Sequence, residues 1–310
     1  MSTRRVLPGA GYTRRLSTLP QLSAASNRLW TPTASLSASV RAVMLRDARG
    51  VELNPAQRLS YFPATPLCTI TWRFDGHAER VNGPFPQREA LAQDPRTALA
   101  GNLLVGGPFN EPSVTYSTGP VHGMMLMLMP DALQLMTGIE AAALVNRLVD
   151  GRDLLPPEWR TWAESMFLLP DDAARCEAVE AFLAPRWQAV RPAPATLNAR
   201  YGDWARHLAI RAALSAPGRS LRQVERVVKR WAGQPMRELQ GVSRLERAFF
   251  ARLAAEKMDD ARWADIAAES GYSDQAHLTR ATRRMTGFPP DELRRRIRDE
   301  EGFWAYRLWM

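Results

Sequence analysis

The spacing of apolar positions divides the chain into two kinds of structure. Within residues 36–130, short apolar runs are separated by Gly, Pro and Asn, which is typical of an antiparallel sheet. The clearest strands are residues 40–45, 68–74 and 121–129. From residue 131 to about residue 187 the apolar period becomes helical. The pattern therefore predicts a mainly antiparallel β domain followed by helices.

The run at 121–129, VHGMMLMLM, allows two interpretations. A cluster of methionines is typical of an adaptable binding wall. Apolar residues at both alternating sets of positions instead indicate a strand that is covered on both faces. We favour the buried strand.

Residues 262–296 predict a helix, a tight turn, a basic helix, a break and a further helix. Gly271 falls where the first helix must end, a position that commonly has a positive φ. Ser273 or Asp274 can cap the second helix. The proline pair at 289–290 enforces a break before the next helix. This arrangement predicts a helix-turn-helix.

The second helix of this unit has two different sides. Leu278, Ala281 and Met285 share an apolar side that can dock on the rest of the domain. The opposite side carries Ala276, Thr279, Arg280 and Arg283. Arg hydrogen-bonds guanine or phosphate, and Ala or Thr contacts the thymine methyl, so this side fits a DNA major groove. The alternative is an amphipathic helix with a solvated basic face, which the turn and break signals disfavour.

The pattern IAxxxGYSDQxHLxRxxRRxTGxxPxEL resembles the second helix-turn-helix of the AraC/XylS transcription regulators. The resemblance covers about the last third of the chain, and many positions agree at fixed spacing. One departure is Thr282, where the family usually has Phe, and this substitution thins the docking side of the helix.

The resemblance implies a second, upstream helix-turn-helix, and SLRQVERVVKRW at 220–231 is the candidate. Ser220 and Gln223 have the spacing of a capping box. The apolar side consists of Val224, Val227, Val228 and Trp231, and the opposite side carries Arg222, Arg226 and Lys229. The preceding helix ends in APGRS rather than in the usual short turn, and a plain surface helix is the alternative. A helix through residues 245–253 can hold the two units rigidly.

The two units suggest distinct roles for their polar residues. We expect bases to be read by Gln275, Ala276, Thr279 and Arg280 from the second unit and by Arg222, Gln223 and Arg226 from the first. We expect phosphates to be contacted by Lys229, Arg230, Arg283 and Arg284. Two helices on one support would enter successive major-groove segments roughly 34 Å apart. The sequence thus predicts recognition of an asymmetric site by a single chain.

The charge distribution supports this interpretation. Residues 186–310 contain 24 Lys and Arg against 15 Asp and Glu, whereas residues 1–185 contain 17 of each. All of the excess positive charge therefore lies in the part with the helix-turn-helix units, as expected for phosphate binding. A non-specific, nucleoid-like DNA-binding protein is the alternative; it predicts little discrimination among sequences and a steep salt dependence.

Two stretches of the N-terminal part resemble the cupin-like effector domain of one AraC-type subgroup. They are FPATPLCTITWRFDG and LLVGGPFNEP…VHGMMLMLMPDALQLMTG. The resemblance implies control by a small-molecule effector or by homodimerisation, with activator function the commoner outcome and repression the alternative. It also implies double-stranded DNA and RNA polymerase as partners. A ligand-independent regulator, in which this domain is only structural, is a further alternative.

The chain lacks the residue clusters that enzymatic relatives of these domains need. Its histidines are His77, His122, His207 and His277, with no HxH pair, so a cupin-type metal enzyme is not indicated. Cys68 and Cys176 form no CxxC and suggest neither a zinc site nor a disulfide framework. A DNA-repair enzyme would need a zinc-bound nucleophilic Cys. We therefore expect no enzyme activity, cofactor or metal.

The expected fold is α+β, with a cupin-like β domain and its following helices, then an all-α domain with two helix-turn-helix units. We expect a poorly ordered basic arm at 1–35, an effector or dimerisation domain at 36–190, a Pro-rich linker at 191–196 and the DNA-binding domain at 197–310. The first 46 residues contain seven Arg and no acidic residue, which can mimic a transit peptide, and a translation start at Met44 is an alternative. No apolar run reaches membrane-spanning length, so we expect a cytoplasmic protein whose aromatic C-terminal tail packs within the chain.

Overall fold

The computed structural model describes residues 17–18, 25–83, 85, 89–193, 200–215, 220–256 and 262–309. Within them, nine strands form one antiparallel sheet in the order β1-β2-β3-β8-β5-β7-β9, with β4 paired to β8 and β6 paired to β5. The strands are β1 (Ser17–Thr18), β2 (Ser26–Trp30), β3 (Val40–Asp47), β4 (Leu59–Phe62), β5 (Cys68–Val81), β6 (Arg96–Ala98), β7 (Leu103–Gly106), β8 (Ser113–Leu128) and β9 (Leu148–Asp150). The predicted antiparallel β domain is confirmed.

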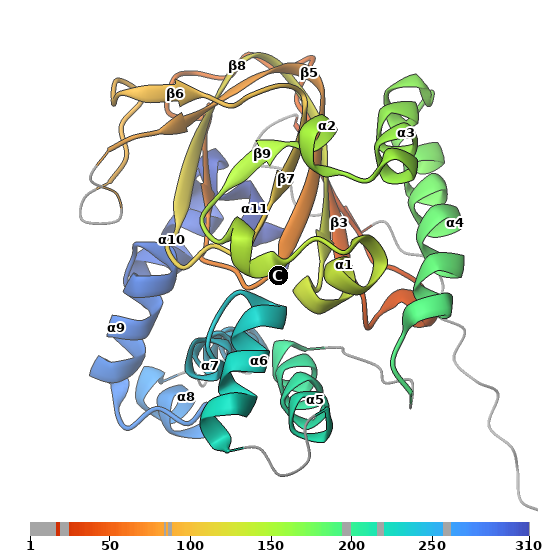
Figure 1. Cartoon of the computed structure of the whole chain (residues 1–310). Coiled ribbons are helices and arrows are strands. Elements are labelled where there is room, and N and C mark those ends of the chain that lie inside the picture. The colour runs from red at the N-terminus through yellow and green to blue at the C-terminus, as the bar shows by residue number, and fades with distance from the viewer. Residues whose placement is uncertain are drawn as a thin grey trace, which may run out of the picture.

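The long strands β5 and β8 form the centre of the sheet. They pair from Cys68 opposite Leu128 to Arg80 opposite Thr115, with shifts of register near Asp75. Figure 1 shows both strands curving over the top of the molecule. The three predicted strands are present, and β5 and β8 extend well beyond their predicted ends. The methionine run is a largely buried strand, as predicted.

The prediction of a poorly ordered arm through residue 35 is wrong for its last part. β2 pairs along its whole length with β3, from Ser26 opposite Asp47 to Trp30 opposite Val43. Trp30 is buried in the main core. The basic, Ser-rich composition gave no sign of this strand. β2 is stabilised by pairing with β3, and no local turn signal marks it in the sequence. Residues 1–16 and 19–24, the rest of the arm, lie outside the described residues.

Helices follow the sheet, with one strand among them. The elements are α1 (Pro130–Thr137), α2 (Gly151–Leu154), α3 (Pro157–Ser165) and α4 (Asp172–Val190), with short 3-10 helices η1 (Ala34–Leu36), η2 (Ala141–Leu144) and η3 (Met166–Leu168). β9 contradicts the continuous helical pattern that we expected after residue 131. It forms because its three residues extend the sheet beyond β7.

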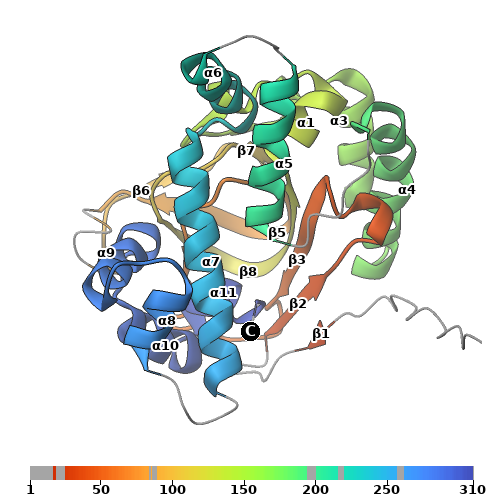
Figure 2. The same ribbon diagram turned by 90° about the horizontal axis from the view of Figure 1, so that it is seen from below.

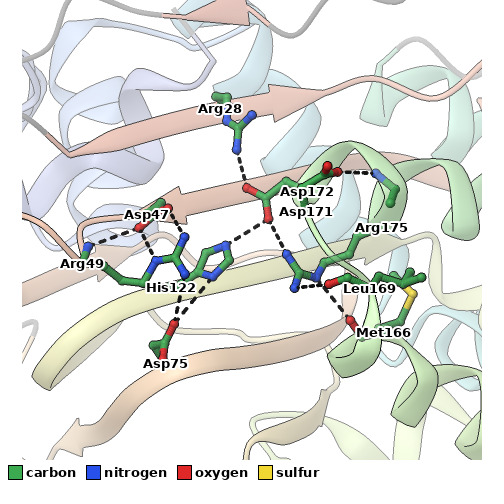
Figure 3. A network of polar contacts seen from close by, with 11 residues as sticks. Arg28, Asp47, Arg49, Asp75, His122, Met166, Leu169, Asp171, Asp172 and Arg175 are labelled. Atoms are coloured by element: carbon green, nitrogen blue, oxygen red, sulfur yellow. Dashed lines mark hydrogen bonds and ion pairs between the residues drawn. The ribbon is translucent and has the colours of Figure 1, made fainter.

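A buried polar network attaches α4 to the sheet (Figure 3). Asp172, in the first turn of α4, accepts hydrogen bonds from Arg28 on β2 and from Arg175 Nη1 at 3.0 Å. His122 Nε2 on β8 lies 2.9 Å from the Asp172 carboxylate. Burial alone would raise the pKa of Asp172, but His122, Arg28 and Arg175 outweigh it and hold that pKa below its ordinary value. His122 is thus a hydrogen-bonded core residue, and no cluster of three potential metal ligands occurs within the described ranges.

The C-terminal part is helical, as predicted. It contains α5 (Tyr201–Leu214), α6 (Leu221–Ala232), α7 (Met236–Glu256), α8 (Trp263–Glu269), α9 (Gln275–Thr286) and α10 (Pro290–Asp299), followed by η4 (Glu301–Phe303) and α11 (Trp304–Arg307). Figure 2 shows α7 running between α5 and α6 at one end and α8, α9 and α10 at the other. The second half of the predicted linker, residues 194–196, lies outside the described residues, as do residues 197–199 of the predicted DNA-binding domain. None of the helices in the described part of the chain has the length and apolar character that a membrane crossing requires.

The C-terminal tail inserts into the face of β4. Phe303 is fully buried and stacks on Tyr61 with 4.6 Å between ring centroids, and Trp304 Nε1 donates to Ser60 Oγ at 3.0 Å. Arg46 Nη1 on β3 donates to Glu301 Oε1 at 2.7 Å. The expectation that the tail packs within the chain is confirmed, and it joins the helical part to the sheet.

Candidate nucleic-acid interface

The second helix-turn-helix consists of α8 and α9, and local sequence explains its turn. Gly271 has φ of 80°, the left-handed conformation that glycine adopts most easily. Asp274 caps α9, because its carboxylate accepts from the backbone N–H of His277 at 2.7 Å. Ile266 on α8 and Leu278 on α9 are buried against each other's helices in one apolar cluster. The unit therefore folds as its sequence predicts.

The two sides of α9 are separated as expected. Leu278 and Met285 are buried on the docking side. On the outer side, Thr279 is half-buried and the other candidate residues are exposed: Gln275, Ala276, Arg280, Arg283 and Arg284. Arg284 differs from its neighbours because its Nη1 donates to Glu238 Oε2 on α7 at 2.7 Å. Arg280 and Arg283 remain available for a ligand.

Thr282 lies on the docking side, where a large apolar residue would fill space. Its side chain is buried, and its hydroxyl donates to the backbone oxygen of Leu278 at 2.9 Å. A cavity of about 200 Å³ lies beside it, and we call it the helix cavity. Its walls include Leu245, Phe249, Thr282, Met285, Leu293 and Tyr306. The small side chain at position 282 thus coincides with a cavity on the docking side of α9.

The first unit consists of α5 and α6. Ser220 and Gln223 form the predicted capping box, in which the backbone N–H of Ser220 donates to Gln223 Oε1 at 2.9 Å. Val227 and Val228 are buried. The cations of α6 are exposed: Arg222, Arg226, Lys229 and Arg230. Residues 216–219, where the APGRS departure lies, are outside the described residues.

The capping box makes a base-reading role for Gln223 less favourable. Its side-chain oxygen is used by the backbone of its own helix, and the side chain is only half-exposed. Base reading by an amide needs both its oxygen and its nitrogen, as in a bidentate contact with adenine. Gln223 is therefore the weakest of the predicted base-reading residues on geometric grounds.

Charge compensation distinguishes the candidate cations from the other arginines of this region. Structural arginines here are paired: Arg211 with Asp131, Arg284 with Glu238, Arg296 with Glu89, and Arg307 with Glu301. By contrast, no residue that the structure describes forms an ion pair with six exposed cations of α6 and α9, which are Arg222, Arg226, Lys229, Arg230, Arg280 and Arg283. Uncompensated charge on two helices is what phosphate or guanine binding requires.

The sheet domain contacts both units on their inner sides, which the sequence did not predict. Asp131 at the start of α1 accepts from Trp204 Nε1 at 2.8 Å and from Arg211 Nη1 at 2.5 Å, both on α5. The backbone N–H of Ala64 donates to the backbone oxygen of Met285 at 2.7 Å. This bond satisfies one of the last carbonyl groups of α9, which have no partner within the helix. No local signal identifies these contacts, because their partners are far apart in sequence.

Comparison with known proteins agrees with this geometry. Residues 202–296 match a family described as a helix-turn-helix domain. No curated protein matches the sequence. Among solved structures, an apo form of ToxT from Vibrio cholerae is similar over 76% of this chain and 92% of that chain, at 9% identity and a TM-score of 0.36. Unsaturated-fatty-acid-bound ToxT from the same organism is similar over 76% and 93%, at 11% identity and a TM-score of 0.31. These structural scores are too low to carry an argument.

The two exposed cationic helices, the turn geometry and the family match define a helix-turn-helix DNA-binding protein. Residues 202–296 thus form a helix-turn-helix domain, and the chain is a DNA-binding transcription regulator.

Proposed function

We propose that this regulator recognises a specific, asymmetric DNA site with α6 and α9 inserted into successive major-groove segments. This proposal rests mainly on the six exposed cations of these two helices that form no ion pair with the described residues. Both helices contact α7, which limits their independent movement. A fixed spacing between two reading helices favours one arrangement of two half-sites over others.

We assign base reading to Arg280, with Gln275, Ala276 and Thr279, on α9, and to Arg222 and Arg226 on α6. Arg283, Lys229 and Arg230 contact phosphates. Two predicted roles become smaller. Gln223 contributes by capping α6, and Arg284 contributes by holding α9 to Glu238 on α7.

We further propose that a small molecule bound in the N-terminal domain adjusts DNA binding. A second cavity, of about 190 Å³, lies within the curved sheet, and we call it the sheet cavity. Its walls include Met44, Phe62, Met124, Met125 and Trp304. Trp304 belongs to the tail that follows α10, so a molecule here would touch both parts of the chain. Met124 and Met125 lie on the buried strand β8 and also line this cavity, which supports the binding-wall interpretation alongside the buried-strand one.

The test is selection from a randomised duplex pool at near-physiological salt, with sequencing of the bound fragments. We expect one enriched asymmetric motif with two blocks about one helical turn apart. Repeating the selection with an extract of cell metabolites tests ligand control, and sedimentation velocity tests whether a homodimer forms.

Three arginine variants separate base reading from phosphate binding on the selected site. Arg280→Ala should cost about 1–3 kcal/mol and relax preference at one base position. Arg283→Ala should weaken specific and random DNA equally and lower the salt slope by about 1. Arg49→Ala, on the sheet domain, is the control and should leave binding unchanged. If Arg280→Ala, like Arg283→Ala, weakens specific and random DNA equally and no motif is enriched, the protein is instead a non-specific, nucleoid-like binder.

A further inference from the structure

The helix cavity lies in the part of the molecule that the DNA-binding role does not use. It is lined by α7, α9 and α10 together with the segment 63–65 of the sheet domain, and residues of α5, α8 and the C-terminal tail complete its walls. The same segment also borders the sheet cavity, so the two cavities are neighbours with separate linings beyond Pro63 and Thr65. The helix cavity is therefore a second, distinct space.

Most polar groups near the helix cavity are already engaged within the protein. The hydroxyls of Thr282 and Thr286 donate to backbone oxygens one turn earlier in α9, at 2.9 Å and 2.8 Å. Arg41 and Glu246, at one end of the cavity, form an ion pair at 2.7 Å. The site consequently offers no free charge to a ligand and presents mainly carbon.

The hydroxyl of Tyr306 is not engaged in this way. The Nε atoms of Arg41 and Arg252 also lack a hydrogen-bond partner among the described residues, but both guanidinium groups have other interactions. Tyr306 lines the cavity, its side chain is buried, and its hydroxyl has no hydrogen-bond partner among the residues that the structure describes. Buried hydroxyls in proteins almost always have a partner, whether protein, water or ligand. Burial raises the pKa of Tyr306, so the group stays protonated and can both donate and accept.

We propose that the helix cavity binds a small, uncharged, largely apolar molecule that carries one hydrogen-bonding group, which pairs with the Tyr306 hydroxyl. The volume supports this class. A dry apolar cavity of about 150 Å³ holds benzene in another protein, so about 200 Å³ fits a substituted aromatic ring or a short branched alkyl chain. Because the arginine nearest one end is paired with Glu246, an anionic ligand gains little there.

The helix cavity lies between α7 and α9, so a ligand bound there would affect how these two helices pack. The molecule would touch Leu245 and Phe249 on α7 and Met285 on α9 at the same time. A ligand that binds only to the present arrangement of these helices stabilises that arrangement. It would therefore hold the second reading helix against the connecting helix.

The test uses the full-length chain with carbon-13 in the methionine methyl groups, and p-cresol and toluene as probes. Met285 reports the helix cavity, while Met44, Met124 and Met125 report the sheet cavity. We expect a saturable shift of the Met285 signal with p-cresol, and saturation at a severalfold higher concentration with toluene, which has no hydroxyl. Tyr306→Phe should abolish the preference for p-cresol.

A cavity-filling variant provides the matched control. Thr282→Phe should abolish the response of the Met285 signal to the probes. The signals of the sheet-cavity methionines should behave as they do in the unmodified protein. Thr282→Leu, a smaller filling substitution, replaces it if the spectrum shows that the Phe variant is unfolded. The proposal is overturned if Met285 does not respond at millimolar probe, if the filled variants respond equally, or if only the sheet-cavity methionines shift. Because no DNA is present, this outcome is independent of whether the chain reads DNA as proposed.

Discussion

Removal of the Glu301 carboxylate should destabilise the whole molecule. Glu301 is 3% exposed in its side chain and lies between two buried cations, 2.7 Å from Arg46 Nη1 and 3.0 Å from Arg307 Nη2. Burial lowers the pKa of Arg46, although Glu301 opposes this effect. Without Glu301, two guanidinium groups would remain buried with no opposing charge.

The size of the effect follows from what each arginine retains. Breaking a buried ion pair by removing one partner costs about 3–5 kcal/mol. Arg46 would keep its bond to Asn27 at 3.0 Å and its place 5.0 Å from the centre of the Trp304 ring, and Arg307 would keep bonds to three backbone oxygens. These contacts place Glu301→Ala near the lower end, at about 3 kcal/mol. Glu301→Gln, which keeps a hydrogen-bonding oxygen, should cost less, at about 1.5–3 kcal/mol.

Urea unfolding followed by tryptophan fluorescence measures both variants. Asp299→Asn is the matched control because its partner, Arg298, is exposed, and it should leave the midpoint unchanged. The double variant Arg46→Ala with Glu301→Ala should be less destabilised than the sum of the single variants, since the pair is lost only once. A loss below about 1 kcal/mol for Glu301→Ala, or strict additivity, would refute the buried-pair argument.

Three further predictions concern other parts of the chain. Asp172→Asn should cost about 2 kcal/mol of stability at neutral pH, since the variant loses charged hydrogen bonds. Because the pKa of Asp172 is lowered in the folded protein, this contribution is present above about pH 4 and is lost as the pH falls. Urea unfolding from pH 7 to 2 should therefore show the stabilities of the two proteins converging. Gly233→Ala should cost more than 2 kcal/mol because φ is 72° and the new methyl would lie 3.0 Å from Val145, whereas Gly271→Ala, with its nearest atom at 3.7 Å, should cost about 1 kcal/mol by thermal unfolding. Gln223→Ala should weaken α6 by about 0.5–1 kcal/mol without changing base preference in the pool selection, and an altered preference would restore its reading role.

Local signals explain why much of the DNA-binding part could be predicted. Gly271, Asp274 and the Ser220–Gln223 pair each act within one turn of chain, so their spacing alone determines the turn and the helix starts. The outer and docking sides of α6 and α9 follow from the helical period. The central strands could be predicted for the same reason, because alternation and turn residues are local.

Features that depend on distant partners escaped prediction. β2 and β9 are short strands that form by pairing with neighbouring strands, and three to five residues give too little pattern to recognise. The sequence cannot show that Arg284 pairs with Glu238, 46 positions away, or that Ala64 caps α9. Thr282 marked a thinner docking side, yet the cavity beside it depends on residues from five helices, the sheet domain and the tail.

The contacts between the two parts of the chain bear on how regulation can work here. The first unit is fixed to the sheet domain through Asp131, and the second through Ala64 and the buried tail at Glu301. These attachments lie on the sides of the units that face away from the candidate DNA-reading residues. A change in the sheet therefore leaves the chemistry of each reading helix intact and acts on the placement of one helix relative to the other. Placement matters only for a site that engages both helices, because a half-site needs only one. If the proposed function is right, we therefore expect control through the sheet domain to change binding to the full two-part site much more than binding to either half.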